Sequence, residues 1–174
     1  MRKRRGKGKR LMAWTREMLL DHLAGLGIKT ETVEHPPLFT VEESQALRGE
    51  IPGAHTKNLF LKCKKGSLWL ITALEETPVN LKTLHHALGS GRLSFGNAEL
   101  LMEVLGVTPG SVSTFGAVND TESRVTVVLD ERLMQHERIN LHPLVNTATT
   151  GLSRDDLIRF LKACGHAPKI MALN

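Results

Sequence analysis

A lysine at the start of a predicted β-strand is the first residue in this sequence that could take part in catalysis or ligand binding. Lys57 precedes an apolar run and shares its alternation with Leu59, Leu61 and Cys63. If the strand already includes position 57, the ammonium lies on a mostly apolar face, where lysine is seldom found without a task. Periodicity alone favours a plainer interpretation, in which pairing begins only at Asn58 or Leu59 and Lys57 is a solvated loop residue.

A polar stretch near the end of the chain is the second candidate. His142 stands before Pro143, and Asn146 and several threonines follow it at a predicted strand end or loop. Imidazole, amide and hydroxyl groups can line a polar pocket, and imidazole can also act as a base near neutral pH. Ordinary loop chemistry explains the same residues, because proline fixes the backbone while Asn and Thr bond locally. On the residues alone this second explanation is the better one.

A short loop with glycine and serine is the third candidate. Pro109, Gly110, Ser111, Val112 and Ser113 can form a turn whose exposed amides bind an anion or an ester carbonyl. Loops of this composition are more often plain connections.

The sequence contains partial matches to familiar catalytic motifs, but each match lacks a residue that the chemistry requires. Gly91–Gly96 has GxxxxG spacing, but Asn97 stands where a phosphate-binding loop needs lysine. His136 and Glu137 begin an HExxH pattern that Asn140 breaks at its second histidine. There is no GxSxG elbow for a serine nucleophile. Phosphate-loop, zinc-protease and serine-hydrolase chemistry are therefore excluded.

The two cysteines, Cys63 and Cys164, stand alone. Neither a disulfide framework nor a metal site is indicated, so we expect core-filling thiols, no metal and no cofactor. The longest strongly apolar run, 68–71, is too short for a membrane span. These features favour a cytoplasmic protein with no membrane partner.

Charge is concentrated at one end of the chain. The sequence has 174 residues, 41% of them hydrophobic, and a net charge of +5. Seven of its 23 Lys and Arg residues lie in 1–10, and the remaining 16 stand against 18 acidic residues, which leaves the rest of the chain at −2. Coating of duplex DNA is therefore disfavoured, and any nucleic acid must be held by a local patch or the tail. We expect a disordered basic tail at 1–12 and one domain at 13–174.

Helices and strands interleave irregularly along that domain. Helical spacing after a Thr15 cap predicts a first helix over 18–26. Further helices are predicted at 41–47, 81–88 and 98–105, the last with Asn97 as its cap. Ser153 and Asp156 form a capping box before a last helix that Gly165 ends. Strands are predicted at 28–33 and 125–129, with a hairpin joining 59–63 to a central strand at 68–73. A mixed sheet packed with helices accommodates these elements.

Four blocks then occur in a telling order: HPPLFTVEES at 35–44, TKNLFLK at 56–62, the Pro109–Ser113 loop and HPLVNTAT at 142–149. In this combination the chain resembles the YbaK and prolyl-tRNA-synthetase-associated editing family over roughly 15–173. It looks most like the freestanding alanyl-tRNA(Pro) deacylases, with cysteine-specific relatives as close competitors. The resemblance implies an α/β fold of the mixed α+β kind, a single domain whose mixed, mostly antiparallel sheet is flanked by helices.

The resemblance also implies an activity and a site. The enzyme would hydrolyse Ala-tRNA(Pro) with a positioned water, and prolyl-tRNA synthetase would be a candidate partner. Lys57, with Thr56 and Asn58 beside it, would hold the tRNA 3′ end or stabilise developing negative charge. The loop of Gly110, Ser111, Val112 and Ser113 would offer backbone donors and shape the pocket. His142, positioning the aminoacyl end or terminal ribose, would work beside Asn146.

One position departs from the family pattern, which completes this loop as GxxxP. Here Thr114 stands in place of the proline. The change removes a fixed backbone angle and adds a donor, so we expect a looser pocket wall and a less secure preference for alanine. Cysteine- or serine-charged tRNA is the alternative substrate. A nonenzymatic nucleic-acid-binding protein that uses its lysines and the tail as a phosphate patch is the alternative of a different class.

Overall fold

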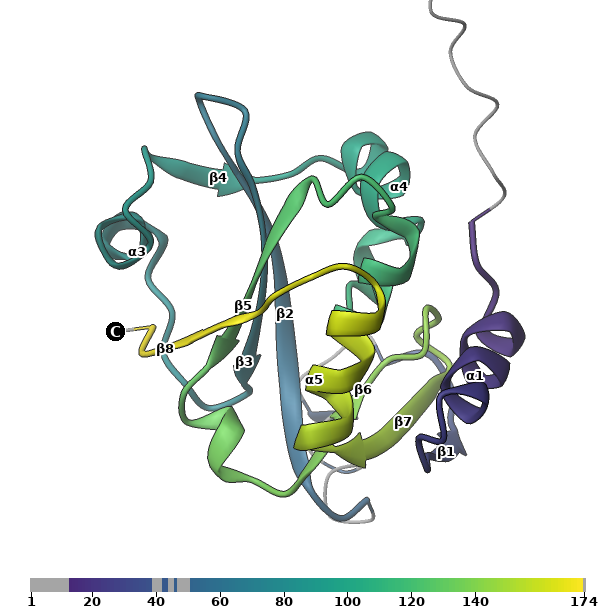
Figure 1. Cartoon of the computed structure of the whole chain (residues 1–174). Coiled ribbons are helices and arrows are strands. Elements are labelled where there is room, and N and C mark those ends of the chain that lie inside the picture. Colours follow the sequence, from purple (N-terminus) through teal and green to yellow (C-terminus); the bar gives the residue numbers. More distant parts are fainter. Residues whose placement is uncertain (1–12, 39–41, 44–45, 47–50, 174) are drawn as a thin grey trace, which may run out of the picture.

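The computed structural model describes residues 13–38, 42–43, 46 and 51–173. The predicted tail lies outside these residues, and so does most of the helix predicted at 41–47. The described chain forms a mixed sheet with helices on both faces (Figure 1). This confirms the fold class predicted above.

The sheet has the strand order β1-β7-β6-β2-β3-β5-β8. β4 lies off this path and pairs with the far end of the β2 edge that β6 also uses. Among the described strands four pairings are antiparallel (β1–β7, β6–β7, β2–β3, β2–β4) and three are parallel (β2–β6, β3–β5, β5–β8). The strands are β1 (Glu31–Glu34), β2 (Ala54–Cys63), β3 (Leu68–Leu74), β4 (Leu93–Phe95), β5 (Val125–Asp130), β6 (Arg138–Leu141), β7 (Ala148–Ser153) and β8 (Lys169–Met171).

The β2–β3 hairpin separates two apolar cores. Along β3, Leu68 and Leu70 enter the larger core, whereas Trp69, Ile71 and Ala73 enter the smaller one. This alternation confirms that β3 is a central strand covered on both faces.

The same hairpin corrects the expectation for Lys57. β2 already begins at Ala54, and Lys57 pairs with Ala73 of β3. The plainer interpretation, with pairing delayed to Asn58 or Leu59, is wrong because β3 extends to Leu74 and provides a partner for these polar residues. Lys57 therefore lies within a paired strand, on the side of the smaller core.

Helices cover the two faces unequally. α1 (Arg16–Gly25), α4 (Ala98–Leu105) and α5 (Arg154–Ala163) contribute leucines to the larger core, whereas α3 (Leu81–Leu88) packs on the smaller one, as Figure 1 shows. The predicted caps are confirmed: Thr15, Asn97 and Ser153 each accept a hydrogen bond from a backbone N–H in the first turn. No helix within the described ranges is long and apolar enough to cross a membrane.

The strand predicted at 28–33 is shorter and lies later. Its first residue, Ile28, follows the Gly27 turn (φ +75°) and is buried in the larger core, so pairing with β7 starts only at Glu31. Three short 3-10 helices, η1 (Pro109–Ser111), η2 (Thr114–Asn119) and η3 (Leu133–Gln135), occupy loops for which no helix is predicted.

A buried carboxylate ties the end of α5 to the start of β5. Asp120 accepts hydrogen bonds from the backbone N–H groups of Arg124 and Val125, at 2.9 Å each, and contacts His166 Nε2 at 2.9 Å. Burial by itself raises the pKa of the Asp120 carboxyl. The contact with His166 and the two backbone donors together lower it by more, so the pKa lies below its ordinary value of 3.8. The folded state therefore favours the ionised form.

This carboxylate makes folding stability depend on pH in the acid range. Because the pKa of Asp120 is lower in the folded state, its contribution is fully present above 3.8 and is lost as the pH falls through the folded-state pKa. Asp120→Asn should lower the free energy of unfolding at neutral pH by about 1–3 kcal/mol, and the difference from the unmodified protein should shrink on acidification. Urea unfolding at stepped pH measures this. Exposed Asp155→Asn is the control, and a pH-independent difference would contradict the assignment.

Candidate functional site

A gap in the sheet lies beside the middle of β2. One edge of β2 pairs with β3 from Thr56 to Lys62. The other edge pairs with β6 only at 54–55 and with β4 only at 61–63. Between these two partners, residues 56–60 face no described strand, although the Phe60 carbonyl accepts a hydrogen bond from the N–H of Gly96. Backbone groups at such an edge are open to a ligand.

Lys57 and His142 follow the β2–β6 pairing at equal distances along the chain. Ala54 pairs with Ile139 and His55 with Asn140 in parallel, and Lys57 and His142 each come two residues after the last paired residue of their segment, with β6 ending at Leu141. Strand alternation also puts both on the same face, because Ile139 and Leu141 point into the larger core. The Lys57 ammonium has no hydrogen-bond or ion-pair partner among the described residues, so its charge is free for a ligand.

The environment of His142 favours the neutral imidazole. Its Nδ1 lies 3.0 Å from the Ala148 carbonyl, which can only accept, so Nδ1 carries a proton, and in the neutral ring the lone pair is then on Nε2. Burial lowers the pKa of His142 below 6.5 and the nearby His35 lowers it further, while the bond to Ala148 acts in the opposite direction. His142 can therefore accept a hydrogen bond near neutral pH.

His35 stands next to it, with ring centroids 6.2 Å apart. Its Nδ1 lies 2.9 Å from the Pro36 carbonyl, and its Nε2 lies 2.9 Å from the Thr149 hydroxyl. The backbone N–H of His35 also donates to the Thr147 carbonyl at 2.9 Å. These bonds fasten the segment after β1 to the predicted polar stretch.

Thr56 and Asn58 lie on the opposite face of β2 from Lys57. The Thr56 hydroxyl donates to the Asn140 carbonyl at 2.9 Å. The Asn58 amide oxygen accepts from the Thr72 hydroxyl at 2.7 Å, and the Thr114 hydroxyl lies 3.4 Å from the same oxygen. Thr114 thus connects the predicted loop to the strand that carries Lys57.

The predicted loop is only partly exposed. Gly110 is exposed and Val112 half-buried, whereas Ser111 and Ser113 are buried. The Ser111 N–H donates to the Thr108 carbonyl at 2.9 Å, so the expectation of exposed amides is wrong at this residue. The Ser113 hydroxyl accepts from the backbone N–H of Phe115 at 3.2 Å and so caps η2.

Gly110 brings the loop against the third block. A Cβ added at Gly110 would lie 3.3 Å from the side-chain nitrogen of Asn146. This is tighter than an ordinary van der Waals contact, so a larger residue at 110 would displace the Asn146 amide. The loop that follows β6 and the loop that precedes η2 are therefore neighbours.

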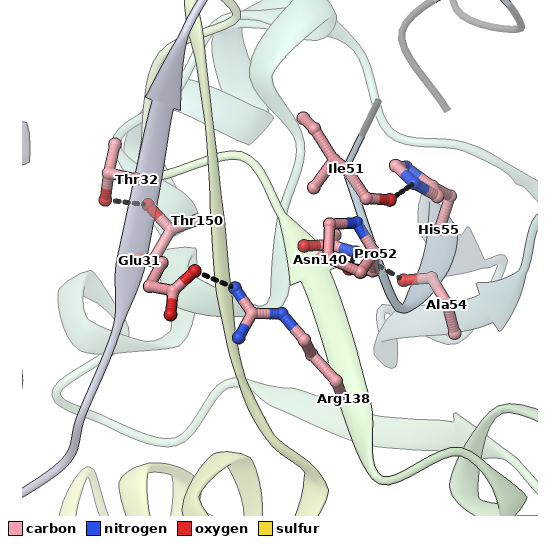
Figure 2. Close-up of polar contacts among 9 residues, drawn as sticks. All are labelled: Glu31, Thr32, Ile51, Pro52, Ala54, His55, Arg138, Asn140 and Thr150. Carbon is pink, nitrogen blue, oxygen red and sulfur yellow. Dashed lines mark hydrogen bonds and ion pairs between the residues drawn. The ribbon is translucent and has the colours of Figure 1, made fainter. Parts of the chain in front are cut away.

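The entry to β2 is anchored by β6 (Figure 2). The Asn140 side-chain amide donates to the carbonyls of Pro52 at 3.0 Å and Ala54 at 3.3 Å. Gly53 between them has φ +105°, and a Cβ there would lie 2.9 Å from Cγ of Arg138. Only glycine fits this turn without strain, and the turn sets where β2 starts.

A hollow of about 720 Å³ adjoins the loop after His142. Two of its members also contact His142: the His35 ring lies beside the His142 ring, and the backbone N–H of Leu144 donates to the His142 carbonyl at 3.0 Å. Its Arg16 side chain is paired with Glu34 at 2.7 Å, which offsets that positive charge. The hollow is lined by Trp14, Thr15, Arg16, Glu17, Glu34, His35, Leu144, Val145 and Thr147.

Comparison with known families decides what kind of domain this is. The profile of the family described as "Aminoacyl-tRNA editing domain" matches residues 35–160, which is most of the chain. The chain belongs to the aminoacyl-tRNA editing domain family.

Relatives within this family cover nearly the whole chain. A protein of Bos taurus named "Prolyl-tRNA synthetase associated domain-containing protein 1" is 42% identical over 161 residues, which are 90% of this chain and 94% of the relative. The "Prolyl-tRNA editing protein ProX" of Acetoanaerobium sticklandii is 36% identical over 159 residues, 91% of this chain and 97% of the relative. A crystal structure described as a candidate trans-editing enzyme for prolyl-tRNA synthetase shares the fold, with a TM-score of 0.65 and 21% identity over 90% of this chain and 94% of that one.

In this editing domain the structure brings some of the predicted residues together. Thr56 and Asn58 belong to one set of hydrogen bonds that reaches Thr114, and Gly110 lies against Asn146, whereas no described contact joins Lys57 to His142. Sequence reasoning did not single out His35 or Thr72. His35 lies within the first of the four blocks, and its partner Thr149 lies within the predicted polar stretch, so the resemblance offered a signal for both. No local pattern marks Thr72.

The protonation of His142 can be followed directly. Its imidazole signal should titrate below pH 6.5 in a ¹H–¹³C NMR experiment, because burial disfavours the charged ring. His35→Gln removes the electrostatic effect of the neighbouring imidazole, so the pKa of His142 should rise, but it should stay below 6.5 because burial, the larger cause, remains. His142→Gln assigns the signal, and titration at or above 6.5 would contradict the neutral imidazole.

Proposed function

We propose that this editing domain hydrolyses the ester between a mischarged amino acid, alanine in first place, and the terminal ribose of proline tRNA. The observation that carries the proposal is the unpartnered ammonium of Lys57 on an open stretch of the β2 edge, with His142, whose Nδ1 is bonded to the Ala148 carbonyl, following the strand that pairs at the start of that edge. The names of the relatives support prolyl-tRNA as the substrate class.

The reaction needs few groups, since an aminoacyl ester is already activated. A water oxygen attacks the carbonyl carbon, the bond from that carbon to the ribose oxygen breaks, and the ribose oxygen takes a proton. Free amino acid and tRNA with a free hydroxyl result. Positioning and stabilisation of the developing negative charge are the main contributions required of the protein.

Each residue then has a role that its environment allows. The Lys57 ammonium pairs with a phosphate of the tRNA 3′ end or with the developing oxyanion. His142 accepts a hydrogen bond through Nε2 from the terminal ribose and so positions the aminoacyl end. Asn58 orients the same end. The wall at Gly110 and Asn146, with Ser111, Val112 and Ser113 behind it, limits the size of the amino acid.

Alanine is the expected target for a physical reason. A site built for proline cannot strongly exclude a smaller apolar side chain, because a missing methylene changes discrimination by only about 1–3 kcal/mol. A second site must therefore admit alanine and refuse the pyrrolidine ring by size. Prolyl-tRNA synthetase is the corresponding partner, since it would supply the mischarged substrate.

A panel of proline tRNA charged with alanine, cysteine, serine or proline tests the proposal. Rapid release of alanine, with little attack on Pro-tRNA, is expected. Lys57→Ala should lower kcat/KM by about 100-fold or more, as for loss of an oxyanion donor, and Lys57→Arg should retain part of the rate. Lys65→Ala, in the exposed β2–β3 turn, is the matched control and should act like the unmodified protein.

Other outcomes of this panel have definite meanings. Preferred release of cysteine or serine would keep the hydrolase and replace its substrate. Full activity of Lys57→Ala would remove the mechanism. No turnover of any charged tRNA, together with tRNA binding that disappears when residues 1–10 are deleted, would establish the nonenzymatic binding protein instead.

A further inference from the structure

A chain of hydrogen-bonding side chains runs from the predicted loop across two strands to β6. The Thr114 hydroxyl contacts the Thr72 hydroxyl, and Thr72 donates to the Asn58 amide oxygen at 2.7 Å. The Asn58 amide nitrogen lies 3.4 Å from the Thr56 hydroxyl, which donates to the Asn140 carbonyl at 2.9 Å. Thr72 and Thr114 are fully buried, so this chain lies inside the domain at that end.

The direction of the chain is set by its last member. A carbonyl can only accept, so the Thr56 proton points to Asn140, and the Thr56 oxygen faces the Asn58 NH₂ group as an acceptor. The Asn58 amide oxygen must then face Thr72, which donates its one proton to it, so the Thr114 hydroxyl is the donor in its contact with Thr72. This orientation leaves Asn58 with one N–H that no described residue bonds.

Thr114 occupies a position where the backbone would also accept proline. It is the first residue of η2, and the preceding Ser113 is extended (φ −156°, ψ 152°), which is the conformation that a residue before proline adopts. The pattern expected from the resemblance has proline here. In this chain the position carries a buried hydroxyl that contacts Thr72 and lies 3.4 Å from the Asn58 amide oxygen.

We propose that Thr114 is a positioning residue that, through Thr72, fixes the Asn58 amide so that its free N–H is presented to the aminoacyl end of the substrate. This inference rests on the proposed deacylase function and adds to it the means by which Asn58 acts. The loop wall at 114 is thus tied to the strand by its hydroxyl, where the sequence led us to expect a looser wall.

The test uses the full chain and alanyl-charged proline tRNA. Thr114→Val removes the hydroxyl but keeps the shape, and it should lower kcat by about 10-fold with little change in KM, since a free-energy difference of about 1.4 kcal/mol corresponds to that factor. Thr114→Ser should stay within about 2-fold, because the donor is kept. Thr77→Val is the matched control: Thr77 is also buried and donates to a carboxylate, Asp130, at 2.6 Å, but takes no part in the chain.

A double-variant cycle asks whether Thr114 acts through Asn58. If it does, Asn58→Ala combined with Thr114→Val should be no slower than Asn58→Ala alone. Multiplying effects, or a Thr114→Val variant as fast as Thr77→Val, would overturn the proposal.

A second readout does not depend on catalysis. The Asn58 side-chain NH₂ signals in ¹H–¹⁵N NMR should shift and broaden in Thr114→Val, but not in Thr77→Val or Thr114→Ser. If the unmodified protein releases no amino acid from any charged tRNA, the proposed function fails, while these signals still decide whether Thr114 fixes the Asn58 amide. Unchanged signals in Thr114→Val would overturn the positioning role in either case.

Discussion

The antiparallel pairing of β2 with β3 is the constraint on which the rest of the structure depends. It runs from Thr56 to Lys62, and every residue of β3 from Leu68 to Ala73 is buried. Because both faces of the hairpin are covered, a register shift of one residue would turn each side chain of the shifted strand toward the opposite core. Lys57 and Asn58 would then lie on the opposite faces of the sheet. The positions of these two residues are therefore fixed by the apolar residues around them.

Electrostatic contrast across the gap follows from the same arrangement. The Nδ1 atoms of His142 and His35 each contact a backbone carbonyl. Burial lowers the pKa of His142 and so favours its neutral form. The ammonium of Lys57 is then the one formal charge of the predicted catalytic pair near neutral pH. A site with one fixed cation and a neutral hydrogen-bond acceptor suits an anionic tRNA end, since the acceptor adds no repulsion between like charges.

Local patterns predicted the parts of this fold that depend on neighbours in sequence. The caps at Thr15, Asn97 and Ser153 and the central position of β3 follow from spacing and composition. The start of β2 was mistaken because its pairing depends on the length of another strand, which residue types near Lys57 do not encode. The contacts of Thr72 with Thr114 and of His35 with Thr149 join residues 42 and 114 positions apart, and only tertiary packing creates them.

A threonine at 114 holds its loop differently from the proline that the resemblance led us to expect. Proline restricts the backbone by covalent structure and needs no partner. A buried threonine hydroxyl holds the loop only while its partner is present, and leaving it unpaired costs about 1–3 kcal/mol. The hydrogen bonding of Asn58 and of Thr72, which is fully buried itself, therefore depends on which residue stands at 114. In this chain the wall of the site and the amide on β2 form one cooperative unit, so a change in any of the three residues reaches the other two.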